Sequence, residues 1–189
     1  MKNIILFGAP GAGKGTQSAI IREKFAFAYI STGEILRSEI KKQTELGKQA
    51  EEIINKGQLV SDEIIVGMIQ SFIELHPNED LLLDGFPRTE QQARALDGIL
   101  ASQNRGNATV IELKVDKEVL MQRLLKRAEI EGRKDDNETT IKERFAQYEA
   151  KTAAVADYYK AKNAYVELDG EHGTPEQISV LLCKTIENL

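Results

Sequence analysis

The chain has 189 residues, of which 41% are hydrophobic and 29% charged, and its formal net charge at pH 7 is −5. This length and apolar content suit one globular domain with a substantial core. The acidic balance argues against a general nucleic-acid or anionic-membrane binder, since both need a surplus of positive surface. A single cysteine, Cys183, excludes an internal disulfide and a cysteine-cluster zinc site, which is typical of a cytoplasmic protein.

An apolar run at residues 3–7 predicts a β-strand that passes directly into a glycine-rich loop, residues 8–17. The G-x-x-x-x-G-K spacing after a strand is typical of a loop that binds polyphosphate, because glycines let backbone N–H groups converge on an anion while Lys14 adds positive charge. An ordinary turn before a helix is the alternative. Gly15 stands where Ser or Thr commonly holds magnesium, so direct coordination by Thr16 stays open, and its hydroxyl can instead reach an inner phosphate.

Strands and helices alternate along the rest of the chain. Further strands are expected at residues 28–30, 81–83, 109–115 and 164–168, and helices at 18–24, 33–42, 46–55, 61–75, from 89 onward, 117–131, 141–161 and 175–187. This alternation predicts an α/β fold with a five-stranded parallel sheet and helices on both faces, in a single domain over residues 1–189. Since ligands gather at the carboxyl ends of such strands, the glycine-rich loop, Ser31-Thr32 and residues 84–88 are expected to lie together.

Asp84 ends a leucine-rich strand and is the second chemical signal. A carboxylate beside a phosphate loop can hold magnesium or its bound waters. A simple Asp-Gly turn is the alternative explanation for this residue.

Arginine is concentrated after strand ends and in one short stretch. The residues are Arg37, Arg88, Arg123, Arg127, Arg133 and Arg144. A solvated face is one explanation, with the charges screened by Glu129, Glu131, Asp135 and Asp136. A phosphoryl-transfer site is the other, because guanidinium forks bind phosphate oxygens and spread transition-state charge. No general base accompanies the arginines, which suits a phosphate acceptor that is already ionised.

From end to end these motifs resemble the adenylate kinases. Residues 8–17 are similar to that family's phosphate loop, including the Gly-Thr after the lysine, and residues 31–37 are similar to its nucleotide-monophosphate segment, with Glu34 where Asp is common. The resemblance implies magnesium-dependent, reversible transfer of the ATP γ-phosphoryl group to AMP in adenine nucleotide homeostasis. It also implies a P-loop NTPase-like fold with two small mobile flaps: an AMP-binding flap at 31–60 and a short lid at 126–136, without zinc.

The resemblance assigns roles residue by residue. The ATP side would comprise Gly11, Ala12, Gly13, Lys14, Gly15, Thr16, Arg123, Arg127 and Gly173. The AMP side would comprise Thr32, Arg37, Gln58, Leu59, Val60, Gly85, Phe86, Pro87, Arg88, Gln92, Arg133 and Arg144. Lys14, Arg88, Arg127, Arg133 and Arg144 would stabilise the transition state, and Asp84 would order Mg²⁺ through water. The Phe86–Pro87 bond is expected to be cis, and the protein is expected to be a cytoplasmic monomer with no nucleic-acid or membrane partner.

Two other functions stay open at this point. A uridylate/cytidylate kinase has a similar loop and similar arginines, but it typically has Asn after the Phe-Pro-Arg segment, and Thr89 and Gln92 favour adenine. A non-catalytic switch that uses ATP to order flaps for a protein partner is the alternative from a different class. The complete set of phosphate-binding arginines favours catalysis over that alternative.

Overall fold

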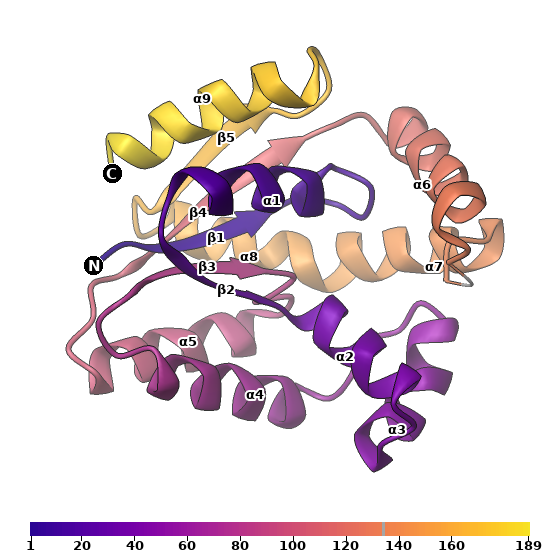
Figure 1. Cartoon of the computed structure of the whole chain (residues 1–189), viewed down its shortest axis with the longest axis horizontal. Helices are drawn as coiled ribbons and strands as arrows, with labels where there is room; N and C mark the ends of the chain where they lie inside the picture. The colour runs from indigo at the N-terminus through magenta and orange to yellow at the C-terminus, as the bar shows by residue number, and fades with distance from the viewer. Residues whose placement is uncertain (134) are drawn as a thin grey trace.

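The computed structural model describes residues 1–133 and 135–189 and contains one parallel sheet, as predicted. Its strands are β1 (Asn3–Phe7), β2 (Phe27–Ser31), β3 (Asp80–Asp84), β4 (Ala108–Lys114) and β5 (Tyr165–Asp169), in the order β2-β3-β1-β4-β5 (Figure 1). The register places Leu6 of β1 beside Asp84 and Phe7 beside Glu112. The carboxyl ends of the three central strands therefore meet at one edge, which is where α/β sheets bind ligands.

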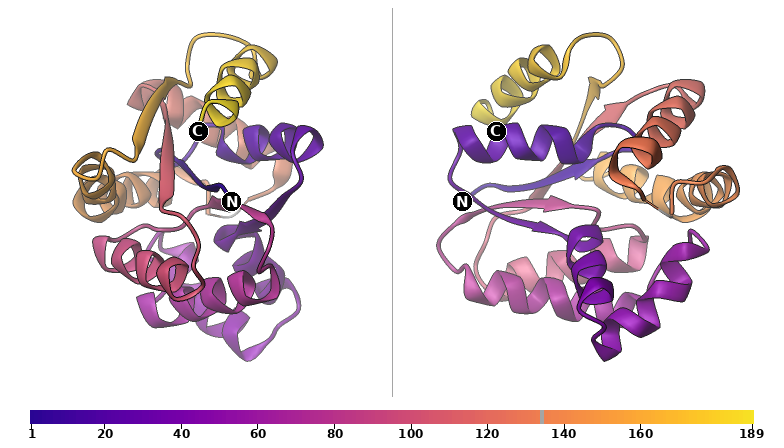
Figure 2. Two further views of the ribbon diagram at one scale, coloured as in Figure 1. Left: turned by 90° about the vertical axis from the view of Figure 1, so that its left-hand side faces the viewer. Right: turned by 45° about the vertical axis from the view of Figure 1, so that its right-hand side comes forward.

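The helices lie on both faces of the sheet. They are α1 (Lys14–Lys24), α2 (Thr32–Lys41), α3 (Glu45–Asn55), α4 (Asp62–Leu75), α5 (Glu90–Ser102), α6 (Lys117–Glu131), α7 (Glu138–Gln147), α8 (Ala153–Lys160) and α9 (Pro175–Glu187). Helices α1 and α9 cover one face, while α4, α5 and α8 cover the other (Figures 1 and 2). No helix among the described residues has the length and apolar character needed to cross a bilayer.

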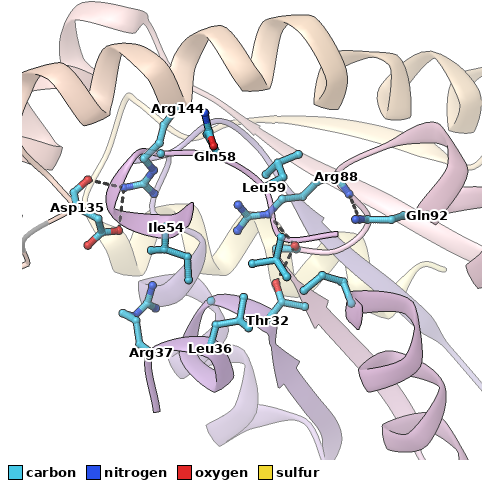
Figure 3. Close-up of a pocket in the computed structure, with 15 residues that line it drawn as sticks. Thr32, Leu36, Arg37, Ile54, Gln58, Leu59, Arg88, Gln92, Asp135 and Arg144 are labelled. Carbon is cyan, nitrogen blue, oxygen red and sulfur yellow. Dashed lines mark hydrogen bonds and ion pairs between the residues drawn. The ribbon is translucent and has the colours of Figure 1, made fainter. Parts of the chain in front are cut away.

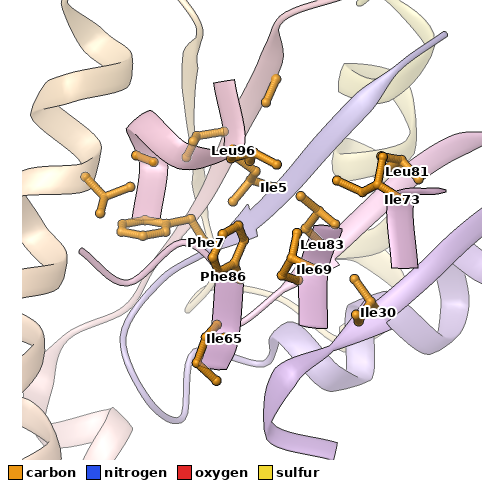
Figure 4. Packing of buried hydrophobic residues seen from close by; sticks show 14 of the residues in the cluster. Ile5, Phe7, Ile30, Ile65, Ile69, Ile73, Leu81, Leu83, Phe86 and Leu96 are labelled. Carbon is orange, nitrogen blue, oxygen red and sulfur yellow. The ribbon is translucent and has the colours of Figure 1, made fainter. Parts of the chain in front are cut away.

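Strand β1 is buried on both faces and separates two apolar clusters. Ile5 points toward α4 and α5, where it joins Leu83 and Ile69 in the cluster drawn in Figure 4. The alternate residue Leu6 points the other way, toward Ile21 of α1. Since successive strand residues face opposite sides, an apolar run without polar interruption is what a central strand covered on both faces requires. Each such fully buried side chain contributes about 1.5–3 kcal/mol to the free energy of unfolding.

Most predicted boundaries lie within two residues of the observed ones, but two differ more. Helix α1 begins at Lys14 rather than at residue 18, because Gly13 adopts a left-handed conformation (φ 95°) and starts the helix directly after the loop. The long helix expected at 141–161 begins at Glu138 and contains a π-helical turn, η1 (Tyr148–Thr152), between α7 and α8. At the two ends of this turn, the Tyr148 hydroxyl donates to Glu112 and the Thr152 hydroxyl donates to the Arg88 carbonyl. The hydrophobic periodicity of the sequence reveals neither these hydrogen bonds nor the wider π-helical geometry.

Helices α2 and α3 project from the sheet edge as a helical pair (Figure 1). Ser31 caps α2 by accepting a hydrogen bond from the Glu34 N–H at 3.4 Å, and Thr44 caps α3 through the Gly47 N–H at 3.0 Å. This pair makes up most of the segment 31–60 that was predicted to bind AMP.

Candidate active site

The loop between β1 and α1 has the conformation that the glycine spacing predicts. Gly11 and Gly13 have backbone φ values of 88° and 95°, which residues other than glycine rarely adopt. The N-terminus of α1 thereby opens toward the carboxyl edge of the sheet, where helix N–H groups favour an anion. Gly15 has no positive φ and lies in the first turn of α1 with open space around it. Ala12 is a core residue, and its N–H donates to the Ala9 carbonyl at 3.1 Å, inside the loop.

A cavity of about 520 Å³ opens above this loop. The predicted site residues that line it are Gly11, Gly13, Lys14, Gly15, Thr16, Arg37, Asp84, Gly85, Arg88, Arg123, Arg127, Arg133 and Arg144. They come from the phosphate loop, α2, the end of β3 and the α6–α7 region. The fold therefore brings all five predicted catalytic cations to one chamber.

Lys14 folds back over the phosphate loop. Its Nζ donates to the carbonyl oxygens of Gly8 at 2.7 Å and Ala9 at 3.1 Å. Desolvation lowers the pKa of Lys14 to about 8; Asp84 opposes this shift and Arg88 adds to it. An anion in the chamber would favour the charged ammonium, so ligand binding and protonation of Lys14 are coupled.

Asp84 is 8% exposed and lies at the end of β3, as predicted. Burial raises the pKa of its carboxyl above the usual value, while Lys14 and Arg88 act in the opposite direction. The Tyr29 hydroxyl donates to Asp84 Oδ2 at 3.5 Å. A carboxylate in this position, beside the phosphate loop, supplies the oxygen donor that a hydrated magnesium ion prefers, so the residues present fit that ion.

Arg88 is fixed by the turn that follows β3. Its Nε donates to the Gly85 carbonyl at 2.8 Å, and the Thr32 hydroxyl donates to the same oxygen at 2.9 Å. The Phe86–Pro87 bond in this turn is cis, which confirms the expectation. Burial lowers the pKa of Arg88 to about 10, and the nearby charge of Arg144 contributes to that shift. Arg88 is thus a partly desolvated cation whose charge a bound anion would stabilise.

The arginines of α6 and α7 are joined by one buried carboxylate. Asp136 is completely buried; it accepts two hydrogen bonds from Arg127, at 2.6 and 2.8 Å, and one from Arg144 at 2.6 Å. Arg133 binds Glu131 at 2.6 Å. Acids therefore do screen these arginines, as the solvated-face explanation expects, yet the same arginines line the chamber. Asp136 was not predicted to be a site residue, and its only signal in the sequence is the acidic pair, Asp135-Asp136, close to Arg133.

A second pocket lies beside the chamber, between α2, α3 and the turn after β3 (Figure 3). Of the predicted AMP-side residues, those lining it are Thr32, Arg37, Gln58, Leu59, Val60, Gly85, Arg88, Gln92 and Arg144. Leu36, Ile54 and Ile65 add apolar side chains. Phe86 and Pro87 instead line an adjoining cavity together with Lys14, and Arg133 lines the larger chamber.

The predicted adenine contact of ATP involves α6 and the loop after β5. Arg123 lines the chamber and donates to the carbonyls of Gly170 at 3.1 Å and Glu171 at 3.5 Å, so it attaches α6 to the loop after β5. Gly173 lies further along that loop and is not among the residues lining the chamber. Its contact with adenine stays a prediction.

A parallel α/β sheet, a phosphate loop after its central strand and a cation-lined chamber with a second pocket beside it define a P-loop phosphotransferase that acts on nucleotides. Comparison with known proteins specifies the family. Residues 6–164 match the adenylate kinase family. The adenylate kinases of Azobacteroides pseudotrichonymphae and Bacteroides fragilis are 47% and 45% identical over 190 residues, covering 100% of this chain and 99% and 100% of those proteins. That of Flavobacterium psychrophilum is 44% identical over 191 residues, covering 100% of both chains.

The chain therefore belongs to the adenylate kinase family and has that family's phosphotransferase activity. The resemblance seen in the sequence motifs is confirmed along the whole chain.

Proposed function

We propose that the protein transfers the γ-phosphoryl group of ATP to AMP, reversibly and with magnesium, and so releases two molecules of ADP. The observation that carries this proposal is that Arg88 and Arg144 line both the phosphate-loop chamber and the second pocket. A triphosphate held by the loop and a monophosphate held in the second pocket would meet between these two guanidinium groups. Such a meeting is what in-line transfer between two phosphates requires.

The chain's own residues supply binding, orientation and charge neutralisation. The phosphate loop and Lys14 hold the donor phosphates, and Arg88 and Arg144 hold the acceptor phosphate against them. Arg127 and Arg133 then balance the negative charge that spreads over the transferring group. The acceptor phosphate is ionised at neutral pH, so no side chain has to remove a proton from it. Asp84 would hold magnesium through its bound waters, and that ion would neutralise further phosphate charge.

Two segments are proposed to close over the substrates. Residues 31–60, the α2–α3 pair, carry Arg37, and residues 126–136 carry Arg127 and Arg133; residue 134 lies outside the described part of this segment. Closure of both would complete the cationic chamber and exclude water, which would otherwise accept the γ-phosphoryl group of ATP. Both segments belong to one proposed domain, residues 1–189.

The pocket in Figure 3 is proposed to hold AMP. Its apolar side chains, among them Leu36, Ile54 and Val60, suit the faces of a purine, while Thr32, Arg37 and Arg88 suit the phosphate and ribose end. Gln92 would read the base edge. Arg123 and the loop containing Gly173 would lie against the adenine of ATP.

The test is ADP formation from Mg-ATP with AMP, UMP, CMP or GMP at equal concentration. AMP is expected to be used best. Preference for a pyrimidine nucleotide would support a uridylate/cytidylate kinase instead, and tight ATP binding without transfer to any monophosphate would support the non-catalytic switch. We also propose that the enzyme acts as a cytoplasmic monomer. Sedimentation of the purified protein tests its oligomeric state.

A further inference from the structure

The amide of Gln92 is held in one orientation by two neighbours. The backbone N–H of Arg88 donates to Gln92 Oε1 at 2.7 Å, and Gln92 Nε2 donates to Asp62 Oδ1 at 2.7 Å. The dashed line between Arg88 and Gln92 in Figure 3 marks the first of these bonds. A backbone N–H can only donate, and an ionised carboxylate can only accept. The two ends of the amide are therefore distinguished by chemistry, because a flipped amide would oppose donor to donor at Arg88 and acceptor to acceptor at Asp62.

Gln92 keeps hydrogen-bonding capacity for a ligand. An amide has two N–H groups and two oxygen lone pairs, and each neighbour uses one of them. Gln92 is 2% exposed and is among the residues that line the second pocket. One donor and one acceptor, in fixed relative positions, are left for a base.

Asp62 acts on this amide from outside the nucleotide pocket. It is the first residue of α4 and lines a separate cavity with Thr89, whose hydroxyl donates to Asp62 Oδ2 at 2.8 Å. It is not among the residues that line the second pocket. Both carboxylate oxygens are thus used within the protein, one to hold Gln92 and the other to hold Thr89 at the N-cap of α5.

We propose that Asp62 is a specificity-determining positioning residue for the acceptor base. This inference rests on the proposed function, in which Gln92 faces that base. Adenine presents an acceptor at N1 beside a donor at N6, whereas a 6-oxopurine presents a donor at N1 beside an acceptor at O6. By fixing the amide together with the Arg88 N–H, Asp62 makes Gln92 complementary to the first pattern and opposed to the second at both atoms. Mismatched polar groups in a buried site discriminate strongly between such bases.

The test compares kcat/KM for AMP and IMP, since IMP differs from AMP at these two edge atoms and lacks the 2-amino group of GMP. The ratio for the wild-type enzyme is expected to favour AMP by about a hundredfold or more. Asp62→Ala leaves an open site in which water can donate or accept, so the ratio is expected to fall by about tenfold. Saturating kcat with AMP should change little, because the phosphate groups are untouched. Asp62→Asn keeps an acceptor oxygen and should retain most of the selectivity.

Glu63→Ala is the matched control, because it removes an exposed carboxylate from the next residue of the same helix turn. Its AMP/IMP ratio should equal that of the wild type. Gln92→Leu tests the underlying assignment: an unchanged ratio would show that Gln92 does not read the base, and the AMP-pocket assignment would then be wrong. A lowered ratio in Gln92→Leu with a wild-type ratio in Asp62→Ala would overturn only the role of Asp62. Equal use of AMP and IMP by the wild-type enzyme would also overturn it, whatever the stability of the variants.

Discussion

Arg127 binds both carboxylate oxygens of Asp136, with Nε–Oδ2 at 2.6 Å and Nη2–Oδ1 at 2.8 Å. Asp136 is fully buried, and its Oδ1 also accepts from Arg144 at 2.6 Å. One carboxylate thereby joins the end of α6 to α7 and sets the spacing of two arginines that line the chamber. It is the countercharge that lets two partly buried guanidinium groups lie close together.

Asp136→Asn should destabilise the protein and lower its activity. Removing this buried charge leaves Arg127 without its two-bond partner and leaves Arg144 with its longer pair to Asp135 Oδ2 at 3.4 Å, at a cost of about 3 kcal/mol in the free energy of unfolding. We expect kcat to fall by at least about tenfold, since the arginines lose their fixed positions. Urea unfolding and ADP production measure the two effects. Glu131→Gln is the control, because its exposed pair with Arg133 contributes at most about 1 kcal/mol; equal stability of the two variants would contradict the role given to Asp136.

Lys14→Met should abolish most turnover without unfolding the enzyme. The loss of one preorganised electrostatic contact with the transferring group costs about 2.7–4 kcal/mol of transition-state stabilisation, or about a hundredfold to a thousandfold in kcat. Thermal unfolding should occur at the wild-type temperature or above it, because a partly buried charge has been removed. Steady-state kinetics and a melting curve test this. Turnover within tenfold of the wild type would remove Lys14 from its central role, and Lys142→Met, on the exposed side of α7, serves as the control.

ATP binding should weaken as the pH rises above neutrality. The pKa of Lys14 in the folded protein is about 8, lowered mainly by desolvation, so the ammonium loses its proton as pH passes through that value. The folded value lies below the ordinary value of 10.5, so this group costs stability below pH 8, and that cost disappears as pH rises to 10.5. Deprotonation of Lys14 therefore does not destabilise the folded protein, and it cannot weaken ATP binding near pH 9 by unfolding the enzyme.

Equilibrium titration with ATP between pH 6.5 and 9.5 measures this dependence, and melting curves at each pH check that the enzyme stays folded. Lys14→Arg provides the comparison, since a guanidinium keeps its charge across the range. A flat profile for the wild type, or the same decline in Lys14→Arg, would show that Lys14 does not control the pH dependence.

Tyr148→Phe should reduce both stability and turnover. The Tyr148 hydroxyl donates to Glu112 Oε1 at 2.7 Å, and Glu112 is a 2% exposed residue of β4. Loss of a hydrogen bond to this buried carboxylate should cost about 1.5–3 kcal/mol. Since Arg144 lies one helical turn before Tyr148, we also expect kcat to fall severalfold.

Tyr158→Phe is the matched control for this prediction. Its hydroxyl donates to Asp97 Oδ2 at 2.6 Å, and this pair joins α8 to α5. Neither residue is among those lining the chamber or the second pocket. This variant should lose stability while keeping the wild-type kcat. If both phenylalanine variants kept full turnover, Tyr148 would be a purely structural residue.

The parts of this enzyme that could be predicted are those in which local sequence determines local structure. The glycine spacing before Lys14 specifies the phosphate loop, and apolar runs such as residues 3–7 specify strands covered on both faces. Arg88 and Arg144 are 56 residues apart in the sequence. The parallel-sheet rule indicates that the region of Arg88 lies at the ligand edge. The arginine-rich stretch left Arg144 between a solvated face and a phosphoryl-transfer site, and the family resemblance assigned it to the AMP side. Their joint presence in two adjoining cavities depends on tertiary packing.

The residues that sequence reasoning missed act through side-chain bonds between distant segments. Asp136 and Asp62 look like ordinary surface acids in the sequence, yet one is completely buried and the other orients Gln92 across 30 positions of the chain. The π-helical turn was missed for the same reason. Thr152 donates to the Arg88 carbonyl at 3.0 Å, a contact that no helical periodicity contains.

Gly47→Ala should separate α2 from α3 and weaken AMP binding. A Cβ at Gly47 would lie 2.1 Å from the Glu39 carbonyl oxygen and 2.6 Å from the Ile40 nitrogen, both backbone atoms that cannot rotate away. We expect the free energy of unfolding to fall by about 3 kcal/mol. The KM for AMP should rise, since α2 carries Arg37. Gly67→Ala is the control: Gly67 is exposed in α4 with nothing near its added methyl group, so this change should stabilise the protein by about 0.5–1 kcal/mol. Chemical denaturation of both variants and AMP titration of their kinetics decide the matter, and a Gly47→Ala enzyme as stable as Gly67→Ala would show that the α2–α3 contact can relax around a methyl group.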